Sequence, residues 1–148
     1  MYSQKIFNNN TCYISGLHRS GKSLLTSIIP SIIETGLINK DPLLNLVSNM
    51  YANKEISFKS ARYLARYIQS NTNYSNFIGR KLNQKKTDET SIYNHLNYKE
   101  YLKKISSKSK FKIAKDFKEE RISFYDVHNV LCNLKFWKQT NDNFKLIN

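Results

Sequence analysis

The sequence contains few of the residues that define several small-protein classes. Its 148 residues include only 4 glycines, 2 prolines and 2 cysteines. Two cysteines, Cys12 and Cys132, are too few for a disulfide framework or a cysteine-based metal cluster, so we expect buried, unreactive thiols. No apolar run approaches the roughly 20 residues of a membrane-spanning helix. The first residues also lack the apolar segment of a secretory signal, so we expect a cytoplasmic protein.

Acidic residues are scarce as well. The chain has 11 Asp and Glu against 24 Lys and Arg, which gives a formal net charge of +13 and a pI near 9.7. Such a charge attracts polyanions, including nucleic acid. However, most of the basic residues are lysines, and Lys, Asn, Tyr and Ile are all frequent, as an A/T-rich coding sequence would produce. We therefore favour a compositional origin for the charge, with nucleic acid as an open but less favoured partner.

Two of the few glycines frame a phosphate-binding motif. Gly16, Gly21, Lys22 and Ser23 satisfy the Walker A pattern G-x-x-x-x-G-K-[ST] at every fixed position. The glycines let backbone N–H groups turn towards an anion, and the helix that follows adds its positive N-terminal end. Lys22 supplies a mobile cation, and Ser23 a hydroxyl for a metal or an oxygen.

The context of the motif supports this interpretation. An apolar run at 12–14 predicts the end of a strand before the loop. The apolar residues after the loop recur at helical spacing and predict a helix to about residue 34. They are Leu24, Leu25, Ile28, Ile29, Ile32 and Ile33. Pro30 should kink this helix and Gly36 should end it.

Further elements follow from periodicity and turn residues. We expect a short strand at 5–7. Helices should begin at 42, with Asp41 as the cap, and should cover 57–70 and 91–105. Turns should lie at 71–76 and 139–143. Residues 80–91 should form a basic polar loop and residues 106–110 a linker. The end of the chain predicts strand 122–127, helix 130–137 and strand 144–147, the pattern of a parallel βαβ unit.

These elements predict a fold class. We expect one P-loop α/β domain over 1–148, with three α/β/α layers, a parallel sheet and a helix-rich middle section. Ligands of such sheets bind at the carboxyl ends of the strands. Because the chain stops at Asn148, directly after the last predicted strand, we expect a truncated protein, the N-terminal part of a larger domain.

The loop also resembles that of a known family. The stretch 15–21, with Ser23-Leu24-Leu25, resembles the sulfotransferase loop that holds the 5′-phosphosulfate of 3′-phosphoadenosine 5′-phosphosulfate (PAPS). The segment Tyr125-Asp126-Val127-His128, a helix and then 144–147 resembles the segment that leads to that family's 3′-phosphate site. The resemblance implies transfer of a sulfuryl group to a hydroxyl or amine acceptor, without a metal.

The resemblance assigns roles to particular residues. His128 and Lys22 would be catalytic, with His128 as a general base, since imidazole titrates near neutrality; the alternative is a surface or helix-capping histidine. His95 is expected to be structural. The residues around the donor phosphate would be Gly16, His18, Arg19, Ser20, Gly21, Lys22, Ser23 and Leu24.

This sequence departs from the family at two places. The family usually carries Thr or Ser where this chain has Lys22. The Arg and Ser that bind the donor's 3′-phosphate would follow Asn148, so their absence would weaken donor binding and catalysis.

Two other functions stay open at this stage. The intact Walker A motif also fits a kinase or NTPase that uses Mg-ATP or GTP, with Ser23 and Asp126 at the magnesium. The charge and the early end of the chain also fit an inactive, anion-binding remnant. We rank sulfuryl transfer first. The sequence identifies neither the acceptor nor the oligomeric state.

Overall fold

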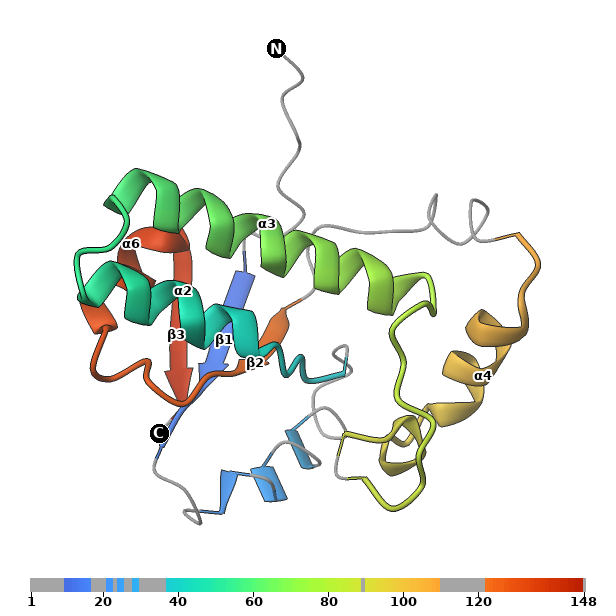
Figure 1. Ribbon diagram of the computed structural model, residues 1–148. Coiled ribbons are helices and arrows are strands. Elements are labelled where there is room, and N and C mark those ends of the chain that lie inside the picture. The colour runs from blue at the N-terminus through green and yellow to red at the C-terminus, as the bar shows by residue number, and fades with distance from the viewer. Residues whose placement is uncertain are drawn as a thin grey trace.

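The computed structural model describes residues 10–16, 21–22, 24–25, 28–29, 37–88, 90–109 and 122–147. The expected strand at 5–7, the kink at Pro30 and the helix end at Gly36 lie outside these residues. The described part is a mixed α/β fold in which a small sheet lies behind the helices of the middle section (Figure 1). No helix in this part is long and apolar enough to cross a membrane.

The sheet has three parallel strands, in the order β2-β1-β3 (Figure 1). They are β1 (Asn10–Ile14), β2 (Ser123–Asp126) and β3 (Asn143–Ile147). The predicted strands near 12–14, 122–127 and 144–147 are therefore confirmed. The last two are parallel, as a βαβ unit requires, but they are not neighbours, because β1 lies between them. Asn39 extends the sheet by a parallel bridge to Tyr125 on the outer edge of β2.

Strands β1 and β2 are largely buried, as is usual for parallel strands, whereas β3 is partly exposed. Side chains alternate along β1, so Tyr13 contributes to one core and its neighbours Cys12 and Ile14 to the other. The first core joins the sheet to the helices through Leu44, Val47, Ala61, Ala65, Tyr125, Val127, Val130, Phe136 and Trp137. The second contains Ile38 and Phe124, with Ile29 packed against it. Apolar side chains therefore pack on each face of the central strand β1.

The helices of the first core begin where polar caps permit. Helix α2 (Pro42–Ala52) starts after Asp41, whose carboxylate accepts from the backbone N–H of Leu43 at 3.1 Å. Helix α3 (Phe58–Phe77) starts after Ser57, whose hydroxyl accepts from the N–H of Ser60 at 3.2 Å. Both caps satisfy a donor that the first helical turn leaves unpaired. The predicted helix starts near 42 and 57 are confirmed.

Helix α3 is longer than its sequence predicts. The expected turn at 71–76 is wrong, because these residues continue the helix to Phe77. Their polar side chains find partners on other segments instead of competing for their own backbone. Thr72 donates to Asp41 Oδ2 at 3.0 Å, and Asn73 Nδ2 donates to Ser123 Oγ at 2.9 Å. These tertiary hydrogen bonds stabilise the last turns of the helix.

The expected helix over 91–105 is also wrong, because it is divided. A 3₁₀ turn, η1 (Ile92–Asn94), precedes helix α4 (Tyr98–Ser106). Between them His95 is buried, as a structural histidine would be, and its Nδ1 accepts from the N–H of Asn97 at 3.0 Å. This bond stabilises the turn that separates the two elements.

The end of the chain shows two further corrections. Helix α6 (Leu134–Thr140) begins four residues later than predicted. It also includes the first two residues of the turn expected at 139–143. The preceding residues 128–133 form turns. Cys132 lies there and is exposed, so its expected burial in a helix is wrong, whereas Cys12 is buried in β1 as expected. The turns are held by bonds to α2 that no local pattern indicates.

We expect the variant Asp41→Ala to lower the free energy of unfolding by about 2 kcal/mol, because it removes a helix cap and leaves the buried Thr72 hydroxyl without its acceptor. Urea denaturation followed by circular dichroism measures the change. Glu55→Ala, an exposed acidic site just after the same helix, is the control and should shift stability by less than about 0.5 kcal/mol. Equal effects of the two variants would contradict the capping role.

Because two tyrosines are buried, we expect the free energy of unfolding to fall at alkaline pH. Burial raises the pKa of Tyr13 and Tyr125 well above the usual value, although Tyr13 accepts hydrogen bonds from Gln69 and Asn141. Above about pH 10 the unfolded chain loses these protons and the folded chain does not, so stability should fall as the pH rises. Absorbance at 295 nm and circular dichroism, followed together, should show the last tyrosines ionising only as the protein unfolds. Complete ionisation with the fold intact would contradict this.

Candidate functional site

The motif lies between β1 and a helical turn, as its sequence predicts. Gly16 follows the strand with φ 146° and Gly21 has φ 83°, both positive values that favour glycine. A Cβ built on Gly21 would meet no atom within 4 Å, so a side chain would not clash there. Glycine is favoured at this position because of its positive φ. The carbonyl of Gly21 accepts from the N–H groups of Leu24 and Leu25 at 3.1 and 3.2 Å. A helical turn therefore starts at the second glycine.

The predicted loop residues fall into two groups. The structure describes Gly16, Gly21, Lys22 and Leu24. His18, Arg19, Ser20 and Ser23 lie outside the described residues. The Leu24 side chain is 64% exposed. Its backbone N–H donates to the carbonyl of Gly21, so the contact of Leu24 with the loop is made by its backbone.

Lys22 brings the loop into contact with the second half of the chain. The residue is only 7% exposed, and its Nζ lies 3.4 Å from Asp126 Oδ1. The same ammonium contacts Nδ1 of His128. Asp126 ends β2 and His128 lies two residues beyond it, more than 100 residues after Lys22 in the chain. The two residues predicted to be catalytic, Lys22 and His128, are thus brought together, with Asp126 beside them.

Asp126 lies between two lysines. Its Oδ1 faces Lys22, and its Oδ2 lies 3.6 Å from Nζ of Lys40. A carboxylate that is 7% exposed needs such partners, because desolvating a lone charge is costly. Among the described residues, two ammonium groups therefore face this one carboxylate.

Sequence reasoning missed Lys40. Its position follows from the bridge of Asn39 to β2, in which the N–H of Asn39 donates to Phe124 O at 2.8 Å and the N–H of Asp126 donates to Asn39 O at 3.0 Å. A single bridged residue leaves no alternating pattern of apolar residues in the sequence. The one local signal was the helix start at Asp41, which directly follows Lys40.

His128 combines an exposed side chain with a fixed backbone. Its N–H donates to Asn45 Oδ1 of α2 at 3.0 Å, and its carbonyl accepts from Ser15 Oγ at 3.4 Å. An ammonium group only donates, so Nδ1 of His128 would be the acceptor in its contact with Lys22.

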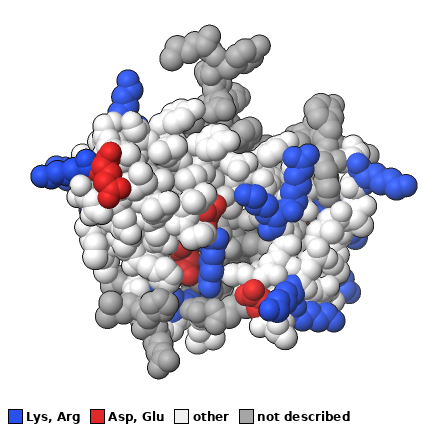
Figure 2. Space-filling model, viewed as in Figure 1, with Lys and Arg blue, Asp and Glu red and all other residues white. Residues whose placement is uncertain are grey.

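Other basic residues are dispersed. On the face shown in Figure 2, Lys and Arg side chains lie in separate groups instead of forming a continuous stripe. Arg62 and Arg66 pair with Asp142 at 3.8 and 3.3 Å, away from the motif. In the part of the chain that the structure describes, no three His, Cys, Asp or Glu residues are grouped as a metal site. Among the described residues, the cluster of Lys22, Asp126 and Lys40 is thus the charged group most closely tied to the motif.

Comparisons of the chain with protein-family models, with curated proteins and with solved structures found no match. Any assignment of function therefore depends on the geometry of Lys22, Asp126, His128 and Lys40.

We expect Lys22 and Asp126 to be energetically coupled. Lys22→Met should lower the free energy of unfolding by about 2 kcal/mol, because it removes one of two cations from a buried carboxylate. The double variant with Asp126→Asn should be more stable than the sum of the single effects predicts, by about 1 kcal/mol or more.

Urea denaturation of the four proteins measures this coupling. Arg66→Met with Asp142→Asn is the matched control, since that ion pair is more exposed and should couple by less than about 1 kcal/mol. Simple additivity at Lys22 and Asp126 would show that the contact does not organise the site.

Proposed function

We propose that this chain binds the phosphosulfate end of PAPS at the carboxyl ends of β1 and β2 and transfers the sulfuryl group to a hydroxyl or amine acceptor. The observation that carries the proposal is the contact between the Lys22 ammonium of the motif and the ring of His128. A phosphate-binding cation and an exposed neutral base meet there at the end of one sheet. Sulfuryl transfer needs both groups at one point.

We also infer the P-loop, three-layer form of the fold. Three features support it: a glycine-bounded segment between β1 and a helical turn, packing of Ile29 on the sheet face opposite α2 and α3, and a sheet whose strands are all parallel. In such folds the ligand site lies beyond the carboxyl ends of the strands, which is where Lys22 and His128 meet.

The described residues fit an anionic nucleotide tail. Gly16 and Gly21 have the backbone freedom that close approach of a phosphate requires, and the space beside Gly21 is open. Lys22 and Lys40 both contact Asp126 and so bring two ammonium groups beside the motif. The helical turn after Gly21 contributes its positive end.

Each residue then has a chemical task. When bound, the donor would supply a sulfuryl group, whose sulfur the acceptor oxygen attacks while the nucleotide phosphate leaves. Lys22 turns from His128 to the phosphate and stabilises the charge that develops on the leaving oxygen. This movement releases Nδ1 of His128, which takes the hydroxyl proton as the new S–O bond forms and the bond from sulfur to the phosphate oxygen breaks.

A phosphotransferase or NTPase that uses Mg-ATP is the second candidate. The observation that favours it is Asp126, an acidic residue on the strand beside the motif, next to Lys22. In P-loop NTPases an acid on a nearby strand and the motif hydroxyl hold magnesium, which here would be Asp126 and Ser23. In the described structure Asp126 contacts two lysines, so a magnesium ion would have to displace at least one of them.

Calorimetric titration separates the two candidates. We expect 3′,5′-adenosine bisphosphate to bind without metal, because the Lys22 ammonium of the motif supplies a cation that is part of the protein. Lys22→Ala should weaken this binding about tenfold or more, whereas Lys138→Ala, an exposed lysine of α6, should leave it unchanged. Binding of Mg-ATP alone would favour the second candidate. Weak binding of both nucleotides would contradict an enzymatic function.

We expect His128→Ala to lower turnover by roughly 10²–10⁴-fold, because the acceptor proton loses its base, with little change in the affinity for the bisphosphate. Sulfate transfer from labelled donor to a panel of hydroxyl acceptors measures the rate. The pH–rate profile of the unchanged protein should fall on the acid side as His128 is protonated, and this limb should disappear in the variant. An unchanged rate in the variant would exclude His128 as the base.

A further inference from the structure

Basic side chains gather on the segments that follow α3. Figure 1 places α4 and the turns before it at one end of the molecule, beside the last turns of α3. Residues 80–108 include eight basic and three acidic residues, and on the face shown in Figure 2 basic side chains lie over this end. The frequency of lysine in the chain explains their number but not their arrangement. We define the basic patch as Arg80, Lys85, Lys86, Lys99, Lys103, Lys104 and Lys108.

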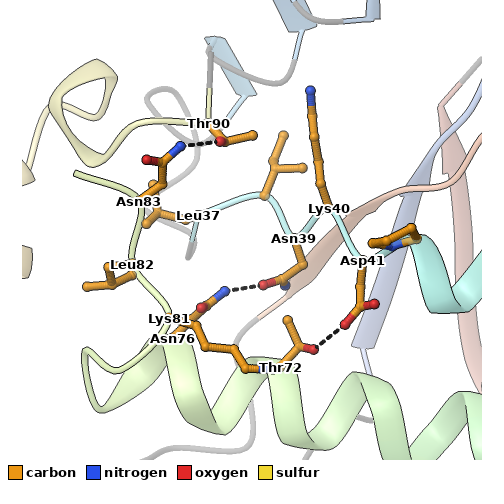
Figure 3. A pocket seen from close by; sticks show the side chains of 12 residues that line it. Leu37, Asn39, Lys40, Asp41, Thr72, Asn76, Lys81, Leu82, Asn83 and Thr90 are labelled. Atoms are coloured by element: carbon orange, nitrogen blue, oxygen red, sulfur yellow. Dashed lines mark hydrogen bonds between the residues drawn. The ribbon is translucent and has the colours of Figure 1, made fainter. Parts of the chain in front are cut away.

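Hydrogen bonds and close packing hold these segments together. The N–H of Ile92 donates to Asn83 O at 2.9 Å, and the amide of Asn83 donates to Thr90 Oγ1 at 2.7 Å, which closes the loop before η1 (Figure 3). Gly79, with φ 77°, lies against the backbone of α4, because a Cβ built on it would lie 3.0 Å from the carbonyl carbon of Lys104. The loop, η1 and α4 therefore form one surface beside the end of α3.

Aromatic rings lie among these lysines. Nζ of Lys86 is 5.3 Å from the ring centroid of Tyr93, and Nζ of Lys104 is 5.4 Å from that of Tyr101. The ring of Tyr93 lies 5.8 Å from that of Tyr98, the first residue of α4. All three tyrosines are partly exposed. Cation–π contacts of this kind restrain the lysine side chains and keep charge and rings side by side at the surface.

Most of the charge of the basic patch is not used in ion pairs. Lys86, Lys99 and Lys103 are exposed and form no ion pair with the described residues. Lys99 and Lys103 are four residues apart on α4, so they share one face of the helix. The nearby carboxylate of Asp88 is bonded within its own loop, where it accepts from the N–H and the hydroxyl of Thr90 at 3.3 and 3.2 Å. These ammonium groups can therefore contact an external anion.

The surface suits a single strand of nucleic acid better than a membrane or an acidic protein. Lysines contact the phosphates of a strand and aromatic rings stack on its bases, so the two residue types are needed side by side. A helix that lies in a membrane surface needs an exposed apolar face. Leu102 and Ile105 of α4 are only partly exposed, and among the described residues of 78–109 the one exposed large apolar residue is Leu96. An acidic protein would offer carboxylates but no bases.

We propose that the basic patch, with Tyr93, Tyr98 and Tyr101, binds a single strand of RNA or DNA. The lysines contact the phosphates, and the partly exposed tyrosine rings stack on the bases. This inference does not depend on the proposed sulfuryl transfer.

Fluorescence anisotropy tests the proposal, with labelled oligouridine and oligothymidine titrated by the full chain at several salt concentrations. Both should bind in a saturable way, because the proposed contacts go to phosphates and bases; binding of one alone would identify the strand as RNA or as DNA. The triple variant Lys86→Gln, Lys99→Gln, Lys103→Gln should weaken binding about tenfold or more. It should also lower the slope of log Kd against log salt by about 2, because each phosphate contact on a single strand contributes about 0.7.

A control variant loses the same charge elsewhere on the surface. It replaces three exposed lysines of α3 and α6: Lys59→Gln, Lys135→Gln and Lys138→Gln. Its Kd should stay within about twofold of that of the unchanged chain, because salt screens charges that do not contact the strand. Equal losses in the two triple variants would show that the overall charge attracts the strand, and would overturn the proposal.

Three comparators test the class of partner. An abasic oligodeoxynucleotide of equal length keeps the phosphates and lacks the bases, so it should bind about fivefold more weakly than oligothymidine. Polyglutamate and phosphatidylserine vesicles represent an acidic protein and a membrane. Equal binding of the abasic strand, binding of polyglutamate or vesicles alone, or no binding of either oligonucleotide overturns the proposal. Titration with 3′,5′-adenosine bisphosphate reports the donor site separately, and the triple variant of the basic patch should bind it normally.

Discussion

The contact between Lys22 and Asp126 is the constraint on which the rest of the site depends. A buried ammonium and a buried carboxylate are stable only when each has a partner, so these two residues fix the motif against β2. Lys40 completes the arrangement from the other side of Asp126. The same three side chains therefore join the motif, β2 and the segment before α2.

The parallel sheet makes this contact possible. Hydrogen bonds tie the strand ends together beyond the ladder: Val127 N–H donates to Ile14 O at 3.2 Å, and Ser15 N–H donates to Ile147 O at 3.0 Å. Parallel pairing brings the carboxyl ends of β1, β2 and β3 to one edge. Residues that follow different strands can then contact one another, while the central strand β1 remains packed on both faces. The sheet thus positions the site and the core positions the sheet.

A cavity of about 310 Å³ lies beside Lys40. Its walls belong to the helix-rich middle section, whose polar side chains bond across segments and not within their own helix. The same bonds that continue α3 through Thr72 and Asn76 also shape the cavity.

The sequence alone determined the strands, the helix starts at Asp41 and Ser57, and the motif with Lys22, because these depend on local signals: apolar periodicity, caps and glycine spacing. It also suggested His128 as a base. Only the tertiary structure decided that β1 separates β2 from β3, that α3 continues through 71–76, and that Lys40 joins the site. The physical reason is that strand order, buried amide bonds and the partners of a carboxylate are contacts between distant residues, which no local pattern encodes.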